Sequence, residues 1–226
     1  MAVLILAQHD NQTLDPAVLH AVTAAAALPG PMHVLVAGAE CGAVAEAAAR
    51  IAGIEKVIRV EHAAYADPVA EDLTPLVVAM AVGYDYVLAA STTFSRNLLP
   101  RVAALLDTAQ LSDIVEVVSP STFRRYVYAG NALTTVESKD EKRVVTVRTT
   151  TFAPAEAEGA AEESADETEA DEPAAPAVAT KPPEKPAEPA AEAEPAEDGA
   201  LRNKRPTGKA SHRLRRRNRG GVATDE

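Results

Sequence analysis

The sequence contains one cysteine, no tryptophan and only eight aromatic residues. The single cysteine, Cys41, excludes an internal disulfide and a zinc site built from several thiolates. We therefore expect a reducing compartment, the cytoplasm. All eight aromatic residues lie at or before Phe152, and the 74 residues after it contain four branched aliphatic side chains. A segment so poor in large apolar groups cannot offset the entropy lost when its backbone is ordered.

Long hydrophobic runs are also missing. No apolar run approaches the roughly 18 residues that a membrane-spanning helix needs. The N-terminal stretch MAVLILA lacks a basic leader and ends at the polar residues Gln8-His9-Asp10, which is typical of a buried first strand and not of a targeting signal. We expect no membrane partner.

The formal net charge of −11 is distributed unevenly along the chain. Residues 1–152 carry 16 acidic and 11 basic side chains, residues 153–198 carry 15 acidic and two basic, and residues 199–226 carry nine basic and two acidic. We therefore expect a folded domain over residues 1–152. An acidic disordered linker rich in Ala, Glu and Pro is expected over residues 153–200, and a basic disordered tail over residues 201–226.

The basic tail includes the segment RNKRPTGKASHRLRRRNR, residues 202–219. Such a cluster of cations binds phosphate without sequence preference. The segment contains no aromatic residue on which a base could stack, and the acidic linker before it competes for the same cations. These features disfavour a nucleic-acid partner.

Short apolar runs alternate with longer helical patterns in the first half of the chain, which is typical of β-α-β units around a parallel sheet. Strands buried on both faces are expected at Val3–Ala7, Val34–Ala37, Val57–Val60 and Tyr86–Ala90. Helical patterns are expected at 15–28, 40–52, 67–83 and 98–106. Pro75 predicts a kink in the third helix or a helix that starts there, and Pro100 is expected in or near the first turn of the fourth.

From Ser112 to Phe152 the apolar positions recur with a period of two, and turn-forming residues separate the runs. This pattern predicts an antiparallel β extension that follows the parallel core and includes Val144, Val145 and Val147. The fold class is therefore α/β, a three-layer α/β/α parallel sheet with an antiparallel extension, followed by a disordered tail.

Polar residues follow several of the expected strands. They are Gln8-His9-Asp10, Gly38 and Ser91-Thr92-Thr93. If the first and fourth strands are neighbours, these residues line the crevice in which open α/β sheets bind ligands. Neither glycine-rich phosphate-loop pattern is present, so ordinary turns at the strand ends are favoured over a small-molecule site.

Three further polar features are candidates for a site. His9 and Asp10 resemble an acid-base pair, but no nucleophile motif accompanies them and neighbouring residues of a strand point in different directions, which favours a solvated turn. Cys41 stands at an expected helix start, where the dipole lowers a thiol pKa, although a lone thiol is more often inert packing. For Arg101, a pairing with a buried carboxylate such as Asp113 is favoured over a role at an interface.

The order of phrases along residues 1–152 closely resembles the N-terminal domain of the electron transfer flavoprotein α subunit. The matching phrases are VLILAQHDNQTLDP, HVLVAG, AGIEKVIRVEH, AASTTFSRNLLPRVAALLD, LSDIVEVVSPSTFRRYVYAGNALTTVES and VVTVRTTTF. The most specific pieces are Asn97–Leu106, Ser112–Ile114 and Tyr128–Ala132.

This resemblance implies a heterodimer with a β subunit that carries FAD. The complex takes electrons from dehydrogenases, such as the acyl-CoA dehydrogenases of fatty acid β-oxidation, and passes them through a quinone oxidoreductase to the respiratory chain. The N-terminal domain is implied to be a scaffold with a fold like that of adenine nucleotide α-hydrolases, packed against the β subunit. The chain is implied to be an electron carrier subunit and not an enzyme.

The family continues into a second α/β domain that supplies most of the flavin contacts and contains a glycine-rich SGGRG-type stretch. Residues 153–226 do not show that pattern, and we expect a truncated or frame-altered form that lacks the FAD domain. We therefore expect no catalytic, cofactor-binding or metal-binding residue here, and FAD is not expected to bind to this chain alone. Two alternatives remain: a stand-alone nucleotide-binding module that uses the crevice near His9 and Ser91, and a non-catalytic protein that binds the β subunit.

Overall fold

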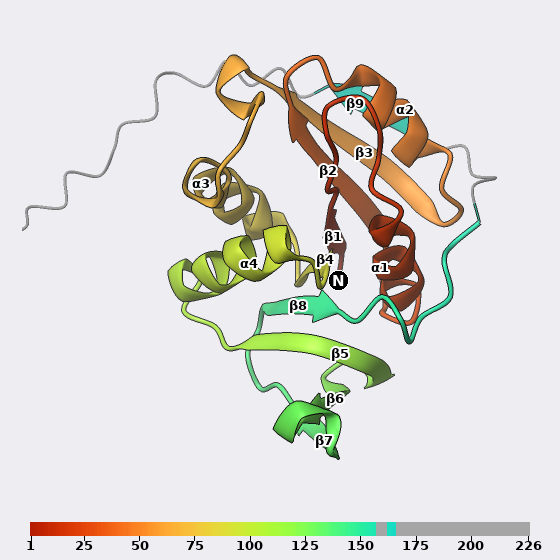
Figure 1. The fold of residues 1–226 in the computed structure, drawn as a ribbon, viewed down its shortest axis with the longest axis vertical. Coiled ribbons are helices and arrows are strands. Elements are labelled where there is room, and N and C mark those ends of the chain that lie inside the picture. Colours follow the sequence, from red (N-terminus) through yellow and green to blue (C-terminus); the bar gives the residue numbers. More distant parts are fainter. Residues whose placement is uncertain (157–161, 166–226) are drawn as a thin grey trace, which may run out of the picture. The chain divides into compact units, whose positions relative to one another are not determined.

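The structure, a computed structural model, describes residues 1–156 and the backbone of residues 162–165 (Figure 1). Its strands are β1 (Val3–Leu6), β2 (Met32–Gly38), β3 (Ile54–Glu61), β4 (Tyr86–Ala90), β5 (Gln110–Ser119), β6 (Thr122–Val127), β7 (Ala132–Glu137), β8 (Arg143–Val147) and β9 (Glu162–Ala165). Its helices are α1 (Ala17–Ala25), α2 (Gly42–Ala49), α3 (Ala70–Met80) and α4 (Thr93–Leu105). Short 3-10 turns are η1 (Ala63–Tyr65), η2 (Ala81–Gly83) and η3 (Tyr128–Gly130). No helix of the described part is long and apolar enough to cross a membrane.

All nine strands form one sheet in the order β7-β6-β5-β8-β4-β1-β2-β3-β9. The seven strands from β5 to β9 in this order pair in parallel, and β6 and β7 pair antiparallel at one end. Helices α1 and α2 cover one face of the parallel part and α3 and α4 cover the other (Figure 1). The predicted three-layer α/β/α fold with an antiparallel extension is confirmed.

The centre of the sheet is apolar on both faces. Every residue of β1 and of β4 is buried, and successive side chains enter the two cores in turn. Ile5 packs toward α1 and α2, whereas Leu4 and Leu6 pack toward α3 and α4. Because each fully buried aliphatic side chain contributes about 1.5–3 kcal/mol, these strands hold both helix layers on the sheet.

The fourth helix starts earlier than predicted, at Thr93 instead of Leu98. Thr92 and Ser95 form a reciprocal capping box, in which the side chain of each accepts a hydrogen bond from the backbone N–H of the other. Pro100 therefore lies inside the helix, and the first-turn position predicted for it is wrong. The helix tolerates the lost hydrogen bond because its face with Leu98 and Leu99 is fully buried.

The third helix begins at Ala70, two residues after the predicted Asp67-Pro68 start. Val69 precedes it in an extended conformation, and the first turn carries Glu71 and Asp72, which the helix dipole favours. Pro75 lies within this helix, so the alternative that a helix starts there is wrong.

Strand β8 is the main topological correction. The period-two pattern placed it in the antiparallel extension, but it lies between β4 and β5 and is parallel to both. All four residues from Val144 to Val147 are buried, as expected of a strand covered on both faces. The chain therefore leaves the parallel core after β5, forms the hairpin β6-β7, and then returns to the core.

The extension begins at a bend in β5. Asp113 adopts a left-handed backbone conformation with φ of 57°, and the pairing with β8 shifts register between Leu111 and Ile114. The bend brings Phe123 of β6 into the core on the side of α1. The hydroxyl of the buried Tyr86 fastens the hairpin by donating a 2.8 Å hydrogen bond to the carbonyl of Pro120.

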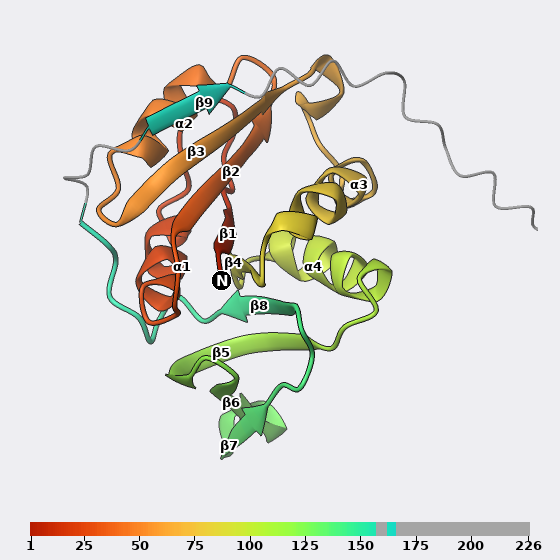
Figure 2. The same ribbon diagram turned by 180° about the vertical axis from the view of Figure 1, so that it is seen from behind.

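After β8 the chain passes beside α1, and strand β9 lies at the opposite edge of the sheet, next to β3 (Figure 2). The backbone N–H of Ala155 donates to Leu19 of α1, and the carbonyl of Glu156 accepts from Ala52 beyond α2. Strand β9 then pairs in parallel with Lys56–Arg59 of β3. Residues 162–165 fall in the range predicted to be a linker. The rest of that range beyond 156, and the whole predicted tail, lie outside the described residues, so these boundaries stay predictions.

A substitution at Lys142 tests how strongly the chain that enters β8 holds the segment that follows α3. Its Nζ donates to the carbonyls of Ala81, Val82 and Tyr84 at 2.7, 3.1 and 2.8 Å. Lys142→Met keeps the apolar stem and leaves these carbonyls without the cation, so we expect a loss of about 1–2 kcal/mol in the free energy of unfolding. Urea denaturation measures it. The exposed Lys139 is the matched control, and a loss from Lys139→Met equal to that from Lys142→Met would contradict the assignment.

Candidate functional site

The crevice predicted at the strand ends exists, because β1 lies between β4 and β2. From β1 the chain builds the sheet outward through β2 and β3, and it later adds β4 on the opposite side of β1. The Oγ1 of Thr92, after β4, donates a 2.5 Å hydrogen bond to the Oε1 of Gln8, after β1. The structure thus brings together two of the three predicted groups of polar residues.

Asn11 closes the crevice between β1 and β2. Its Oδ1 accepts from the backbone N–H of Ala39 at 3.1 Å, and its Nδ2 donates to the carbonyl of Ala66 at 2.6 Å. Its own N–H donates to Nδ1 of His9, and its φ is 69°. Asn11 therefore ties together the loops that follow β1, β2 and β3, and sequence reasoning had not singled it out.

Gly38, at the end of β2, gives Asn11 and His9 their space. A Cβ atom at this position would lie 2.3 Å from the Oδ1 of Asn11 and 2.8 Å from the Cε1 of His9. Gly38, the third predicted group, therefore also lies at the crevice, where β2 closely approaches the loop after β1. These contacts fill the ends of β1 and β2 with the chain's own side chains.

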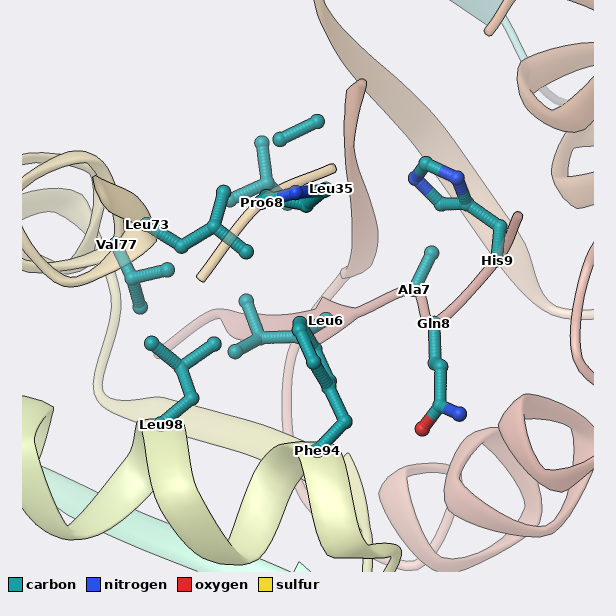
Figure 3. A pocket seen from close by; sticks show the side chains of 11 residues that line it. Leu6, Ala7, Gln8, His9, Leu35, Pro68, Leu73, Val77, Phe94 and Leu98 are labelled. Atoms are coloured by element: carbon teal, nitrogen blue, oxygen red, sulfur yellow. The ribbon is translucent and has the colours of Figure 1, made fainter. Parts of the chain in front are cut away.

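A small pocket remains between the crevice and helices α3 and α4 (Figure 3). It has a volume of about 170 Å³ and is lined by Leu6, Ala7, Gln8, His9, Leu35, Ala37, Pro68, Leu73, Val77, Phe94 and Leu98. No arginine or lysine lines this pocket. None lines the two shallower hollows beside His9 and Asp10 either. Ligand pockets usually enclose about 300–1,000 Å³, so this pocket fits neither FAD nor the phosphates of a nucleotide.

His9 and Asp10 do not interact as an acid-base pair. Burial lowers the pKa of His9, partly opposed by a hydrogen bond to Ala37 and by the charge of Asp10. The carboxylate of Asp10 accepts from the N–H groups of Thr13 and Gln12 and from the Thr13 hydroxyl, which lowers its pKa. Each side chain thus organises its own part of the turn.

Cys41 is fully buried at the start of α2. Burial raises the pKa of its thiol, with a further contribution from the charge of Glu61. The helix start does not produce the lowered thiol pKa that was considered from the sequence. The geometry makes Cys41 a packing residue.

The predicted pairing of Arg101 with Asp113 is wrong. Arg101 binds Glu71 at 2.5 Å and so links α4 to α3. Asp113 instead accepts two hydrogen bonds from Arg148, of 2.9 and 2.5 Å, and lies 3.8 Å from Arg96. Burial raises the pKa of Asp113, but the hydrogen bonds of Arg148 and Ser91 and the charges of both arginines outweigh it and hold the pKa below its usual value.

Exposed apolar side chains gather on the antiparallel extension. We call Val118, Tyr126, Tyr128 and Leu133 the extension face. Tyr126 and Leu133 are direct cross-strand partners, and Tyr128 is 82% exposed at the turn between β6 and β7. The guanidinium of Arg148 lies 5.3 Å from the centre of the Tyr126 ring. Tyr128 and Ala129 have left-handed backbones, so the turn holds the Tyr128 side chain in water at a conformational cost.

A family model described as "Electron transfer flavoprotein domain" matches residues 3–194. The chain belongs to the electron transfer flavoprotein family. It is 52% identical over 159 residues to the electron transfer flavoprotein subunit alpha of Pseudomonas aeruginosa, an alignment that covers 70% of this chain and 52% of that protein. The subunit alpha of Bradyrhizobium diazoefficiens is 48% identical over 161 residues, which cover 71% of this chain and 51% of the relative.

A third relative supports the same family assignment. The electron transfer flavoprotein subunit alpha of Paracoccus denitrificans is 46% identical over 153 residues, which cover 67% of this chain and 49% of the relative. The chain spans about half the length of the curated relatives it matches. The resemblance found from the sequence is therefore confirmed for the α-subunit family, over the part of the chain that folds as the sheet.

The close approach at Gly38 predicts a specific coupling. Gly38→Ala should lower the free energy of unfolding by about 1–3 kcal/mol, because the new methyl group displaces Asn11. In an Asn11→Ala background the same change should cost less, and a double-mutant cycle by urea denaturation measures the difference. Gly83→Ala is the control, since nothing lies within 4 Å of a Cβ there. Equal costs of Gly38→Ala in both backgrounds would exclude the coupling.

The lowered pKa of His9 predicts an acid sensitivity. Below pH 6.5 the unfolded chain takes up a proton at His9 before the folded chain does, so the free energy of unfolding falls between pH 6.5 and the folded pKa. His33, whose pKa burial also lowers, adds to the same slope. His9→Gln should flatten the slope relative to that of the wild-type chain. Urea denaturation at a series of pH values tests this, and an unaltered slope in His9→Gln would refute it.

Proposed function

We propose that the chain acts as the N-terminal scaffold domain of an electron transfer flavoprotein α subunit and binds a β subunit through its extension face. In this role it contributes to a heterodimer that takes electrons from dehydrogenases, such as the acyl-CoA dehydrogenases of fatty acid β-oxidation. The heterodimer passes them to the respiratory chain through a quinone oxidoreductase. We place this activity in the cytoplasm. Membership of the family and the names of the α-subunit relatives support the proposal.

The observation that carries the partner proposal is the exposure of the extension face. Tyr128 is 82% and Leu133 is 51% exposed, and both belong to one hairpin, in which Tyr126 pairs directly with Leu133 and Tyr128 lies in the turn. Exposed apolar groups that cluster are typical of protein interfaces, and tyrosine and arginine are the residue types that contribute most to binding there. Arg148 beside the Tyr126 ring completes that combination.

The apolar pocket at the strand ends does not fit FAD. The apolar pocket of about 170 Å³ is too small for an isoalloxazine with its ribityl and diphosphate groups, and no cation lines it. We therefore derive no electron-transfer step from this chain. We propose that FAD is bound only in the assembled complex, by groups beyond residues 1–156, which agrees with a chain that spans about half of its relatives.

Co-expression with the cognate β subunit tests the partner surface. The double variant Tyr128→Ser/Leu133→Ser should lose most of the β subunit that co-purifies with the wild-type chain, because it removes two central apolar contacts. Val82→Ser is the matched control, since Val82 is 76% exposed but lies in η2. Circular dichroism checks that all three chains fold alike. Equal recovery of β subunit with the double variant and the control would contradict the proposed surface.

The visible absorption spectrum of the same complex tests the electron-carrier role. Flavin bands in the wild-type complex support an electron-transferring assembly that includes this chain. A colourless complex would contradict that role and would favour the alternative of a non-catalytic protein that binds the β subunit.

A further inference from the structure

A polar notch lies beside the extension, apart from the apolar pocket. It has a volume of about 250 Å³ and is lined by Ser91, Arg96, Asp113, Arg148, Thr149 and Thr150. Four elements meet there: the ends of β4 and β8, the first turn of α4 and the bend in β5. The notch shares no lining residue with the pocket near His9.

Cations exceed anions in the notch. Arg148 donates through Nε and Nη2 to Asp113, and Arg96 donates through Nε to the hydroxyl of Ser91 at 3.0 Å. The Nη1 group of each arginine has no hydrogen-bond partner among the described residues. Two guanidinium groups face one carboxylate, so the notch keeps a net positive charge and two groups of free donors.

Asp113 fixes the position of Arg148. The carboxylate accepts two nitrogens of the same guanidinium, and the bend that carries it is itself held by the Thr146 hydroxyl, which accepts from the Asp113 N–H at 2.8 Å. The Tyr126 ring covers another part of that guanidinium. A cation held in this way loses little conformational entropy when it binds an anion.

The turn after β8 adds donors from the backbone. The N–H of Thr151 donates to the carbonyl of Arg148, which closes a turn around Thr149 and Thr150. The N–H groups of these two threonines donate to no acceptor within residues 1–156. Consecutive free N–H groups in a turn, next to side-chain hydroxyls and guanidinium groups, form a concave set of donors suited to an anion.

We propose that this notch binds a phosphoryl group through Arg96, Arg148 and the Thr149-Thr150 turn. Guanidinium, hydroxyl and backbone N–H donors approach from α4 and from the segment after β8, which matches the several oxygens of a tetrahedral phosphate better than the two of a carboxylate. The notch also lies beyond the carboxyl ends of β4 and β8, the edge at which open α/β sheets bind ligands. Binding at this place needs neither FAD nor a β subunit, so it stands or falls independently of the proposed function.

Titration of the isotopically labelled full chain with inorganic phosphate, followed by NMR at low ionic strength, tests the site. We expect saturable shifts of the Ser91, Thr149 and Thr150 amides with a dissociation constant in the millimolar range. Because Arg96 is 61% exposed, added salt should weaken the binding. The absence of saturable shifts at these amides would overturn the proposal.

Arg96→Gln should weaken phosphate binding about tenfold, the effect of losing one charge-assisted hydrogen bond. It is a better probe than a change at Arg148, which also anchors Asp113. Arg50→Gln is the control, because Arg50 is an exposed arginine on the other side of the sheet, at the end of α2, paired with Glu46. Equal binding by the Arg96→Gln and control chains, or equal weakening in both, would overturn the site.

Two further ligands identify the chemistry. Acetate should bind much more weakly than phosphate, and equal affinity would overturn the phosphoryl assignment in favour of a carboxylate site. AMP distinguishes the sources of the phosphoryl group. Shifts at the same amides with tighter binding than phosphate indicate a nucleotide, whereas weaker binding than phosphate indicates free phosphate, and both outcomes support the notch.

Discussion

The burial of β1 and β4 on both faces is the constraint on which the rest of the structure depends. Each strand needs apolar side chains at every position, since one face meets α1 and α2 and the other meets α3 and α4. Polar chemistry is thereby excluded from the centre of the sheet. It is confined to the residues that follow the strands and to the extension, and both candidate surfaces lie there.

At the ends of β1 and β2, the chain satisfies its own polar groups. Asn11 bridges three loops, Asp10 organises its turn, and Gln8 accepts from Thr92. These polar groups are exposed or half-buried, and their partners belong to the same chain. The crevice in which other α/β folds bind ligands is therefore filled, between β1 and β2, by the chain's own side chains. Beside it lie a small apolar pocket and two shallow hollows, and no arginine or lysine lines any of the three.

The sequence predicted those features that depend on neighbouring residues. Continuous apolar runs identified β1 and β4, and the polar residues after them correctly indicated where the two strand ends meet. Strand β8 was misplaced because a run such as Val144–Val147 fits either kind of strand, and only the return of the chain to the core decides between them. The start of α4 was missed because Thr92 and Ser95 cap a polar first turn that apolar periodicity does not detect.

Contacts between distant residues were beyond local patterns. Arg101 is closer to Asp113 in sequence than Arg148 is, yet Arg148 binds it, because β8 inserts next to β5 and carries Arg148 to the bend. The partner of the half-buried Asp113 carboxylate is thus set by strand order, which spacing along the sequence does not reveal. The sequence did contain one relevant signal, because Ser112–Ile114 is among the pieces that match the family most specifically. That match pointed to this segment but did not indicate which residue binds Asp113.

Arg148 belongs to both of the proposed surfaces, the notch and the extension face. Its guanidinium holds Asp113 in the notch and lies over the Tyr126 ring of the extension face. The side chain stands at the end of β8, so its position is fixed by the parallel core, whereas Tyr126 belongs to the antiparallel hairpin. A shift of the hairpin relative to the core changes the contact of this cation with the Tyr126 ring. A partner that presses on the extension face and an anion in the notch therefore act on one shared side chain, and linkage requires that any effect of the first on the affinity of the second be matched in reverse.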